Sequence, residues 1–104
     1  MKPMHEAFYN DVYNIVSQIP EGKVLTYGVI ADLTGWGKHQ RMVGKALKEA
    51  PAELKLPCHW VVSSNGRTVP EWNEQIDMLR DEGITFRNSN CVDIKRHMWR
   101  PEEF

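Results

Sequence analysis

The chain has 104 residues, a formal net charge of −1 and a hydrophobic fraction of 41%. This length suits one domain, 1–104, with a modest core, and the near-neutral charge argues against a generally basic nucleic-acid binder. No apolar run reaches the roughly 20 residues of a membrane span, and the N-terminus lacks a signal-peptide pattern. Two cysteines, Cys58 and Cys91, do not make a disulfide framework, so we expect a cytoplasmic, reduced protein without a membrane partner.

The first half of the chain predicts three helices. Apolar residues at spacings of three and four indicate an amphipathic helix over 4–18. A short extended piece over 23–25 leads to Thr26, the expected N-cap of a helix that runs to about Leu33. A third helix is expected over 38–49. Two short helices joined by a glycine-containing turn are typical of a helix-turn-helix.

The second half predicts strands, turns and one more helix. A strand is expected to begin at Cys58, and 64–66 (Ser-Asn-Gly) predicts a type I′ turn with 67–69 as the return arm. A fourth helix is expected over 70–82, with Trp72, Ile76 and Leu79 on one face, and a second hairpin is expected over 84–94. The predicted fold is therefore α+β and mainly helical, a winged helix-turn-helix-like domain with short β-hairpins.

One face of the third predicted helix is basic. Its cations follow one another at spacings of three, four and three: Lys38, Arg41, Lys45 and Lys48. That spacing places all four side chains on one helical face. Such a stripe on the second helix of a helix-turn-helix indicates DNA binding, although a solvated surface face would look the same.

Cys58 and His59 stand side by side behind a proline. A cysteine is nucleophilic only as the thiolate, and a nearby imidazole can take its proton. The alternative is a small buried hydrophobic residue, which is what most free cysteines are. A zinc site built from these two residues with Cys91 and His97 is not expected, because the ligand spacing is wrong.

Four segments together resemble the C-terminal domain of the O6-alkylguanine-DNA alkyltransferases. They are Gly-Lys-Val-Leu-Thr-Tyr-Gly at 22–28, Arg-Met-Val-Gly-Lys-Ala at 41–46, Pro-Cys-His-Trp-Val-Val at 57–62 and Glu-Gly at 82–83. The N-terminal α/β domain of the full-length enzymes has no counterpart here. In this respect the chain is similar to the stand-alone alkyltransferase-like proteins, which bind alkylated DNA and commonly lack the cysteine.

The resemblance implies a partner, double-stranded DNA that contains O6-alkylguanine, bound through the minor groove with the damaged base flipped out. Arg41 would enter the base stack in place of that base, and Tyr27 would press on the neighbouring phosphate. Met42 and Gly44 would face the groove, with Lys38, Lys45 and Lys48 as further DNA contacts. Base extrusion costs a few kcal/mol, less where an alkyl group has weakened the pairing.

The resemblance also implies a chemical step. Cys58 would accept the alkyl group irreversibly, and Glu82 would orient the His59 imidazole. His59 would take the thiol proton through a water, because neighbouring side chains such as Cys58 and His59 point to opposite faces of a strand. No metal or cofactor is needed for this single-turnover methyltransferase reaction.

The sequence departs from the family pattern around the nucleophile. Ala50 stands where an asparagine is usual, Trp60 replaces an arginine, and Gln75 aligns with a lysine. The loop before the fourth helix is also shorter than in the full-length enzymes.

Two functions follow from this pattern. The retained Cys58, His59 and Glu82 favour direct repair by a monomeric, minimal alkyltransferase. The alternative is a non-catalytic lesion sensor that flags damage for nucleotide excision repair proteins. A small transcription regulator is a third possibility, but it leaves the Cys58–His59 pair unexplained.

Overall fold

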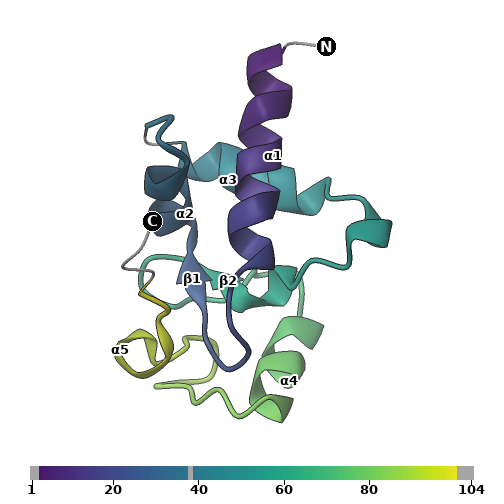
Figure 1. The fold of residues 1–104 in the computed structure, drawn as a ribbon. Coiled ribbons are helices and arrows are strands. Elements are labelled where there is room, and N and C mark those ends of the chain that lie inside the picture. The colour runs from purple at the N-terminus through teal and green to yellow at the C-terminus, as the bar shows by residue number, and fades with distance from the viewer. Residues whose placement is uncertain (1–2, 38, 101–104) are drawn as a thin grey trace.

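The computed structural model describes residues 3–37 and 39–100. Figure 1 shows a small two-stranded sheet with α1, α2 and α3 on one side and α4 and α5 on the other. The elements in chain order are α1 (Pro3–Ser17), β1 (Leu25–Thr26), α2 (Tyr27–Thr34), α3 (Gln40–Lys48), the 3-10 turns η1 (Ala52–Leu54) and η2 (Cys58–Trp60), β2 (Val61–Val62), α4 (Glu74–Asp81) and α5 (Ile94–His97). The predicted α+β class with mainly helical structure is confirmed. Within the described part of the chain, no helix has the length and apolar character to cross a membrane.

The sheet separates two apolar clusters. β1 and β2 pair in parallel, with Leu25 opposite Val61 and Thr26 opposite Val62. Successive strand residues point to opposite faces, so Leu25 and Val61 pack among α1, α2 and α3, whereas Val24 and Val62 pack with residues of α4 and the segment after it. Trp60 contacts both clusters. Burial on both faces explains why this stretch is apolar without alternation.

The predicted helices of the first half are confirmed with small shifts at their ends. The apolar stripe of α1 is fully packed, because Phe8, Val12, Ile15 and Val16 are all buried, as is Ile19 just beyond the helix. Thr26 caps α2 as predicted, because its Oγ1 accepts a hydrogen bond from the Val29 N–H at 3.2 Å. α2 ends at Gly35, whose φ of 78° suits glycine.

α3 begins at Gln40, two residues later than predicted, after Gly37 at a φ of 101°. Its buried face is Val43 and Ala46. The opposite face carries the predicted basic stripe as exposed side chains of Arg41, Lys45 and Lys48. Lys38 lies outside the described residues.

The strand predicted from Cys58 begins three residues later, at Val61. Cys58 to Trp60 instead form a 3-10 turn, in which the Trp60 N–H donates to the Pro57 carbonyl at 3.0 Å. The expectation that Cys58 and His59 alternate across a strand is therefore wrong, because the chain closes a tight turn immediately after the proline.

The first predicted hairpin keeps a hydrogen bond between its arms, from the Ser63 N–H to the Arg67 carbonyl at 3.0 Å. The Gly66 N–H donates to the Ser63 carbonyl at 2.9 Å, and Gly66 has a φ of 90°. Asn65 does not have a positive φ, so the predicted type I′ turn is wrong. Arg67 forms an antiparallel bridge with Cys91, so the return arm pairs with the C-terminal region.

The second predicted hairpin is present as an antiparallel bridge between Phe86 and Val92. Its second arm ends early, because α5 starts at Ile94. The fourth predicted helix, 70–82, is shorter than expected and begins at Glu74.

Candidate functional site

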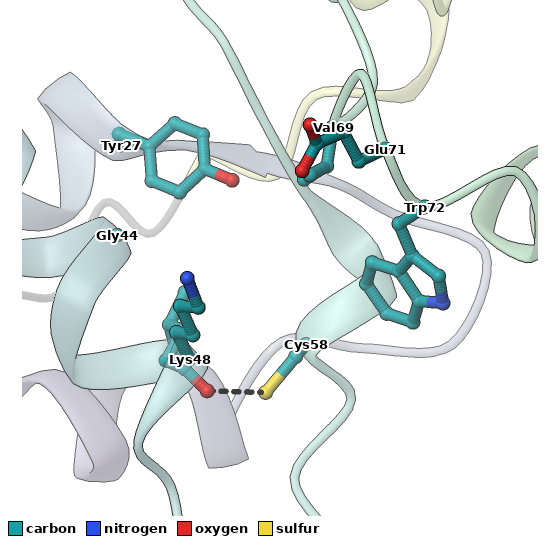
Figure 2. Close-up of a pocket in the computed structure, with 8 residues that line it drawn as sticks. Tyr27, Gly44, Lys48, Cys58, Val69, Glu71 and Trp72 are labelled. Atoms are coloured by element: carbon teal, nitrogen blue, oxygen red, sulfur yellow. Dashed lines mark hydrogen bonds between the residues drawn. The ribbon is translucent and has the colours of Figure 1, made fainter.

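A pocket of about 510 Å³ opens between α3, the start of α2, the η2 turn and the loop before α4 (Figure 2). Four residues singled out from the sequence meet there, namely Tyr27, Gly44, Lys48 and Cys58. The other lining residues are Leu47, Val69, Glu71 and Trp72. The walls are therefore mostly apolar, with polar groups at a few points, as is usual for a small-molecule site.

The Cys58 thiol lies at one side of this pocket, and its nearest polar contact is a main-chain oxygen. Sγ is 3.9 Å from the Leu47 carbonyl, a long hydrogen bond drawn in Figure 2. Burial raises the pKa of Cys58 above its ordinary value, and a backbone hydrogen bond offsets part of that effect. The thiol is therefore protonated at neutral pH, which makes it a poor nucleophile.

His59 contacts Glu82, as the resemblance implied. The imidazole Nε2 lies 3.0 and 3.1 Å from the two carboxylate oxygens. Among the described residues, no hydrogen bond joins His59 to Cys58. The structure thus brings together two members of the implied relay and leaves the thiol apart from them, and the catalytic roles of all three stay predictions.

Trp60 adds a contact to this pair that the sequence did not suggest. Its indole N–H donates to Glu82 Oε1 at 2.6 Å. The side chain at the position of the usual arginine therefore binds Glu82 through its single donor.

Tyr27 is the first residue of α2 and extends its ring into the pocket (Figure 2). Burial raises the pKa of its hydroxyl, with a smaller contribution from Cys58. Gly44 faces this ring from α3: a Cβ at Gly44 would lie 3.9 Å from Tyr27 Cε1. The absence of a side chain at Gly44 keeps this side of the pocket open.

The remaining predicted DNA contacts lie on α3 and do not line the pocket. Arg41 and Lys45 are exposed. Met42 is half-buried and packs against the helical cluster, so only part of its side chain is free to face a groove. Of the three described cations of the basic stripe, Lys48 therefore lines the pocket, whereas Arg41 and Lys45 lie farther along α3 and do not.

Sequence reasoning missed Gln75, which connects the pocket wall to the cysteine segment. Its side chain is fully buried. Its Oε1 accepts from the Val69 N–H at 2.7 Å, while its Nε2 donates to the carbonyls of His59 and Val61 at 3.0 and 3.1 Å. The signal available in the sequence was a polar residue, Gln75, at an inward-facing position of the helix predicted over 70–82.

Trp72, Val69 and Glu71 were also missed as pocket residues. Trp72 was predicted to lie on the inner face of the fourth helix. It precedes α4 and turns its ring toward the pocket.

Within residues 3–37 and 39–100, no three His, Cys, Asp or Glu side chains come together as a metal site would require.

A half-buried cysteine, a tyrosine at a helix start and an adjacent basic helix meet around one pocket, as expected for the DNA-binding domain of an alkyltransferase. The family described as "6-O-methylguanine DNA methyltransferase, DNA binding domain" matches residues 7–84. The chain belongs to this O6-alkylguanine-DNA alkyltransferase family.

Within the family, the chain is similar to alkyltransferase-like and base-flipping proteins. It is 35% identical over 105 residues to alkyltransferase-like protein 1 of Schizosaccharomyces pombe, which covers 92% of this chain and 97% of the relative. It is 38% identical over 97 residues to the DNA base-flipping protein of Escherichia coli, which covers 90% of this chain and 75% of the relative.

One solved structure extends this similarity to the fold. S. pombe Atl1 in complex with damaged DNA containing O6-carboxymethylguanine has a TM-score of 0.85 to this chain at 33% identity. The alignment covers 97% of this chain and all of the other.

Proposed function

We propose that this protein binds O6-alkylguanine in duplex DNA as a non-catalytic sensor, and that it holds the flipped base in the Cys58 pocket without taking its alkyl group. The observation that carries the proposal is the state of the thiol. Cys58 is a protonated thiol directed at the Leu47 carbonyl, and His59 is bound to Glu82. The similarity to a lesion-bound alkyltransferase-like structure supports the same function.

The DNA contacts follow from the two helices beside the pocket. α2 and α3 would act as a helix-turn-helix that enters the minor groove, where readout is degenerate and lesions can be found in any sequence. Arg41, exposed on α3, would fill the gap left by the base, and Tyr27 would press on the adjacent phosphate. The bound complex would then be handed to nucleotide excision repair proteins.

Alkyl transfer to Cys58 is the second candidate, favoured by the retained contact of His59 with Glu82. In that reaction a bond forms from Sγ to the alkyl carbon, the bond from that carbon to the guanine oxygen breaks, and the thiol proton passes to His59. We favour the sensor because the chain is similar to alkyltransferase-like and base-flipping proteins.

Intact-mass measurement after incubation with a methylated duplex separates the two candidates. If the protein is a sensor, its mass should be unchanged after incubation. It should also bind the methylated duplex more tightly than a matched unmodified duplex. The variant Cys58→Ala should then bind the lesion like the parent. An added methyl group that maps to Cys58 would refute the proposal and establish transfer.

The proposed insertion of Arg41 into the base stack is tested by fluorescence anisotropy. Arg41→Ala should weaken lesion binding more than Lys45→Ala, because Lys45 would contact only phosphate. Equal losses would show that Arg41 is one more backbone contact.

A further inference from the structure

Two oppositely charged side chains line the pocket from different elements. Lys48 comes from the last turn of α3, and Glu71 comes from the loop before α4. Figure 2 shows Lys48 rising on one side and Glu71 on the far side, above Trp72. In the described part of the chain neither forms an ion pair or a hydrogen bond, so both remain available to a ligand.

The other residues that line the pocket carry no charge, so Lys48 and Glu71 dominate its electrostatics. Leu47, Val69 and Trp72 offer no charge, and the Cys58 thiol is neutral. A DNA strand that covers the pocket would expel water from it, and charge interactions strengthen when water is removed. A substituent on the flipped base would therefore experience Lys48 and Glu71 as its charged contacts, beside the neutral Tyr27 hydroxyl.

We infer that Lys48 gives this pocket a preference for O6 substituents that carry a carboxylate over neutral alkyl groups, and that Glu71 limits this preference. The inference rests on the proposed function, since it concerns the lesion held in the same pocket. A lysine ammonium provides three donors and a full positive charge for a carboxylate. Glu71 repels the same group, so its removal strengthens the preference.

A competing role for Lys48 is contact with a backbone phosphate, as its place in the basic stripe would suggest. That role predicts equal loss of affinity for every duplex when the charge is removed. The preference between two lesions, rather than affinity itself, is therefore the quantity to measure.

The test uses the full chain and three duplexes of one sequence that carry guanine, O6-methylguanine or O6-carboxymethylguanine. Affinities are measured by anisotropy at physiological salt. The parent should bind the carboxymethyl lesion more tightly than the methyl lesion. Lys48→Met keeps most of the aliphatic stem and should reduce that ratio by about three- to tenfold, the range expected for one partly exposed charge-assisted hydrogen bond.

Two further variants complete the design. Glu71→Gln should raise the ratio by several-fold, because it removes the repulsive charge at nearly constant shape. Lys45→Met, one turn earlier on α3, is the matched control: it should weaken binding to all three duplexes and leave the ratio unchanged.

The outcomes separate this inference from the proposed function. If Lys48→Met and Lys45→Met both leave the ratio unchanged, Lys48 is a phosphate contact and the inference is wrong. If the parent binds both lesions better than guanine but equally well, the sensor stands and the inference fails. If the parent shows no preference for either lesion over guanine, the proposed function itself fails.

Discussion

The indole nitrogen of Trp60 lies 2.6 Å from Glu82 Oε1, and it donates a hydrogen bond to the same carboxylate that contacts His59. The Trp60 ring also packs against both apolar clusters. The carboxylate of Glu82, on the C-terminal side of α4, is thereby attached to a residue that the core holds in place.

Replacement of Trp60 by phenylalanine tests this attachment. Trp60→Phe keeps an aromatic ring but loses the donor, so we expect the free energy of unfolding to fall by about 1–2 kcal/mol. Urea denaturation measures the change. Trp36→Phe is the matched control, because the Trp36 indole donates to Asp11 Oδ2 at 2.8 Å on the exposed surface. Equal losses in the two variants would show that the Glu82 contact adds nothing beyond an ordinary surface bond.

Substitution of Gln75 should be more costly. Gln75→Leu is close in volume but leaves the Val69 N–H and the carbonyls of His59 and Val61 without their partner. Unsatisfied buried groups cost about 1–3 kcal/mol each, so for three groups we expect a loss of about 3 kcal/mol or more in the free energy of unfolding. Gln18→Leu, which removes an exposed side-chain bond to Asn14, should change it by less than about 0.5 kcal/mol. Similar losses of stability in Gln75→Leu and Gln18→Leu would contradict the role of Gln75 in joining Val69 to the cysteine segment.

Alanine substitutions at two glycines with similar φ angles distinguish the cost of a steric collision from the cost of backbone strain. Gly66 and Gly83 have φ of 90° and 85°. A Cβ at Gly66 would collide with the Val92 carbonyl oxygen, whereas a Cβ at Gly83 would meet nothing within 4 Å. We expect Gly83→Ala to cost about 1 kcal/mol and Gly66→Ala roughly 3 kcal/mol or more, measured by thermal or urea unfolding. A Gly66→Ala variant as stable as Gly83→Ala would show that the contact between Gly66 and residue 92 relaxes easily.

The raised pKa of Cys58 predicts slow modification at neutral pH. Thiolate is the reactive form, so a pKa above the ordinary value of 9.0 lowers its fraction below that of a free cysteine at any pH near neutrality. Alkylation of Cys58 by iodoacetamide, followed by peptide mass mapping, should accelerate as the pH is raised to 9 and beyond. Rapid modification at pH 7, faster than that of a one-cysteine peptide, would show instead that a base activates the thiol.

Local sequence signals predicted the helical half of this fold well. The apolar spacing of α1 and the Thr26 cap depend on residues within one or two turns of each other, and both are present. The parallel pairing of β1 with β2 was not predicted, because it joins residues 25–26 to 61–62 and nothing local specifies such a partner. The type I′ turn failed for a local reason: Gly66 alone takes the positive φ, and the Asn65 side-chain oxygen accepts from the Arg67 N–H at 3.3 Å.

The candidate site was predicted in its residues more than in its geometry. Tyr27, Gly44, Lys48 and Cys58 meet at one pocket, as a shared site would require. The 3-10 turn over Cys58–Trp60 was not predicted, because this segment was interpreted as a strand. Trp72 was missed because α4 starts at Glu74, which leaves Trp72 in the preceding loop, and Gln75 was missed because a polar side chain was not expected at a buried position.

The Gln75 amide has a consequence for the range of lesions that can fit. One planar group fastens the wall residue Val69 to the turn that carries Cys58. Because Val69 and Cys58 face the same pocket, a bulky adduct cannot push the Val69 wall outward without also pulling on the cysteine turn. Room for a larger adduct must therefore come from moving the side chains of Lys48, Glu71 or Trp72 toward solvent. The pocket can widen on the side of these three residues and resists widening between Val69 and Cys58.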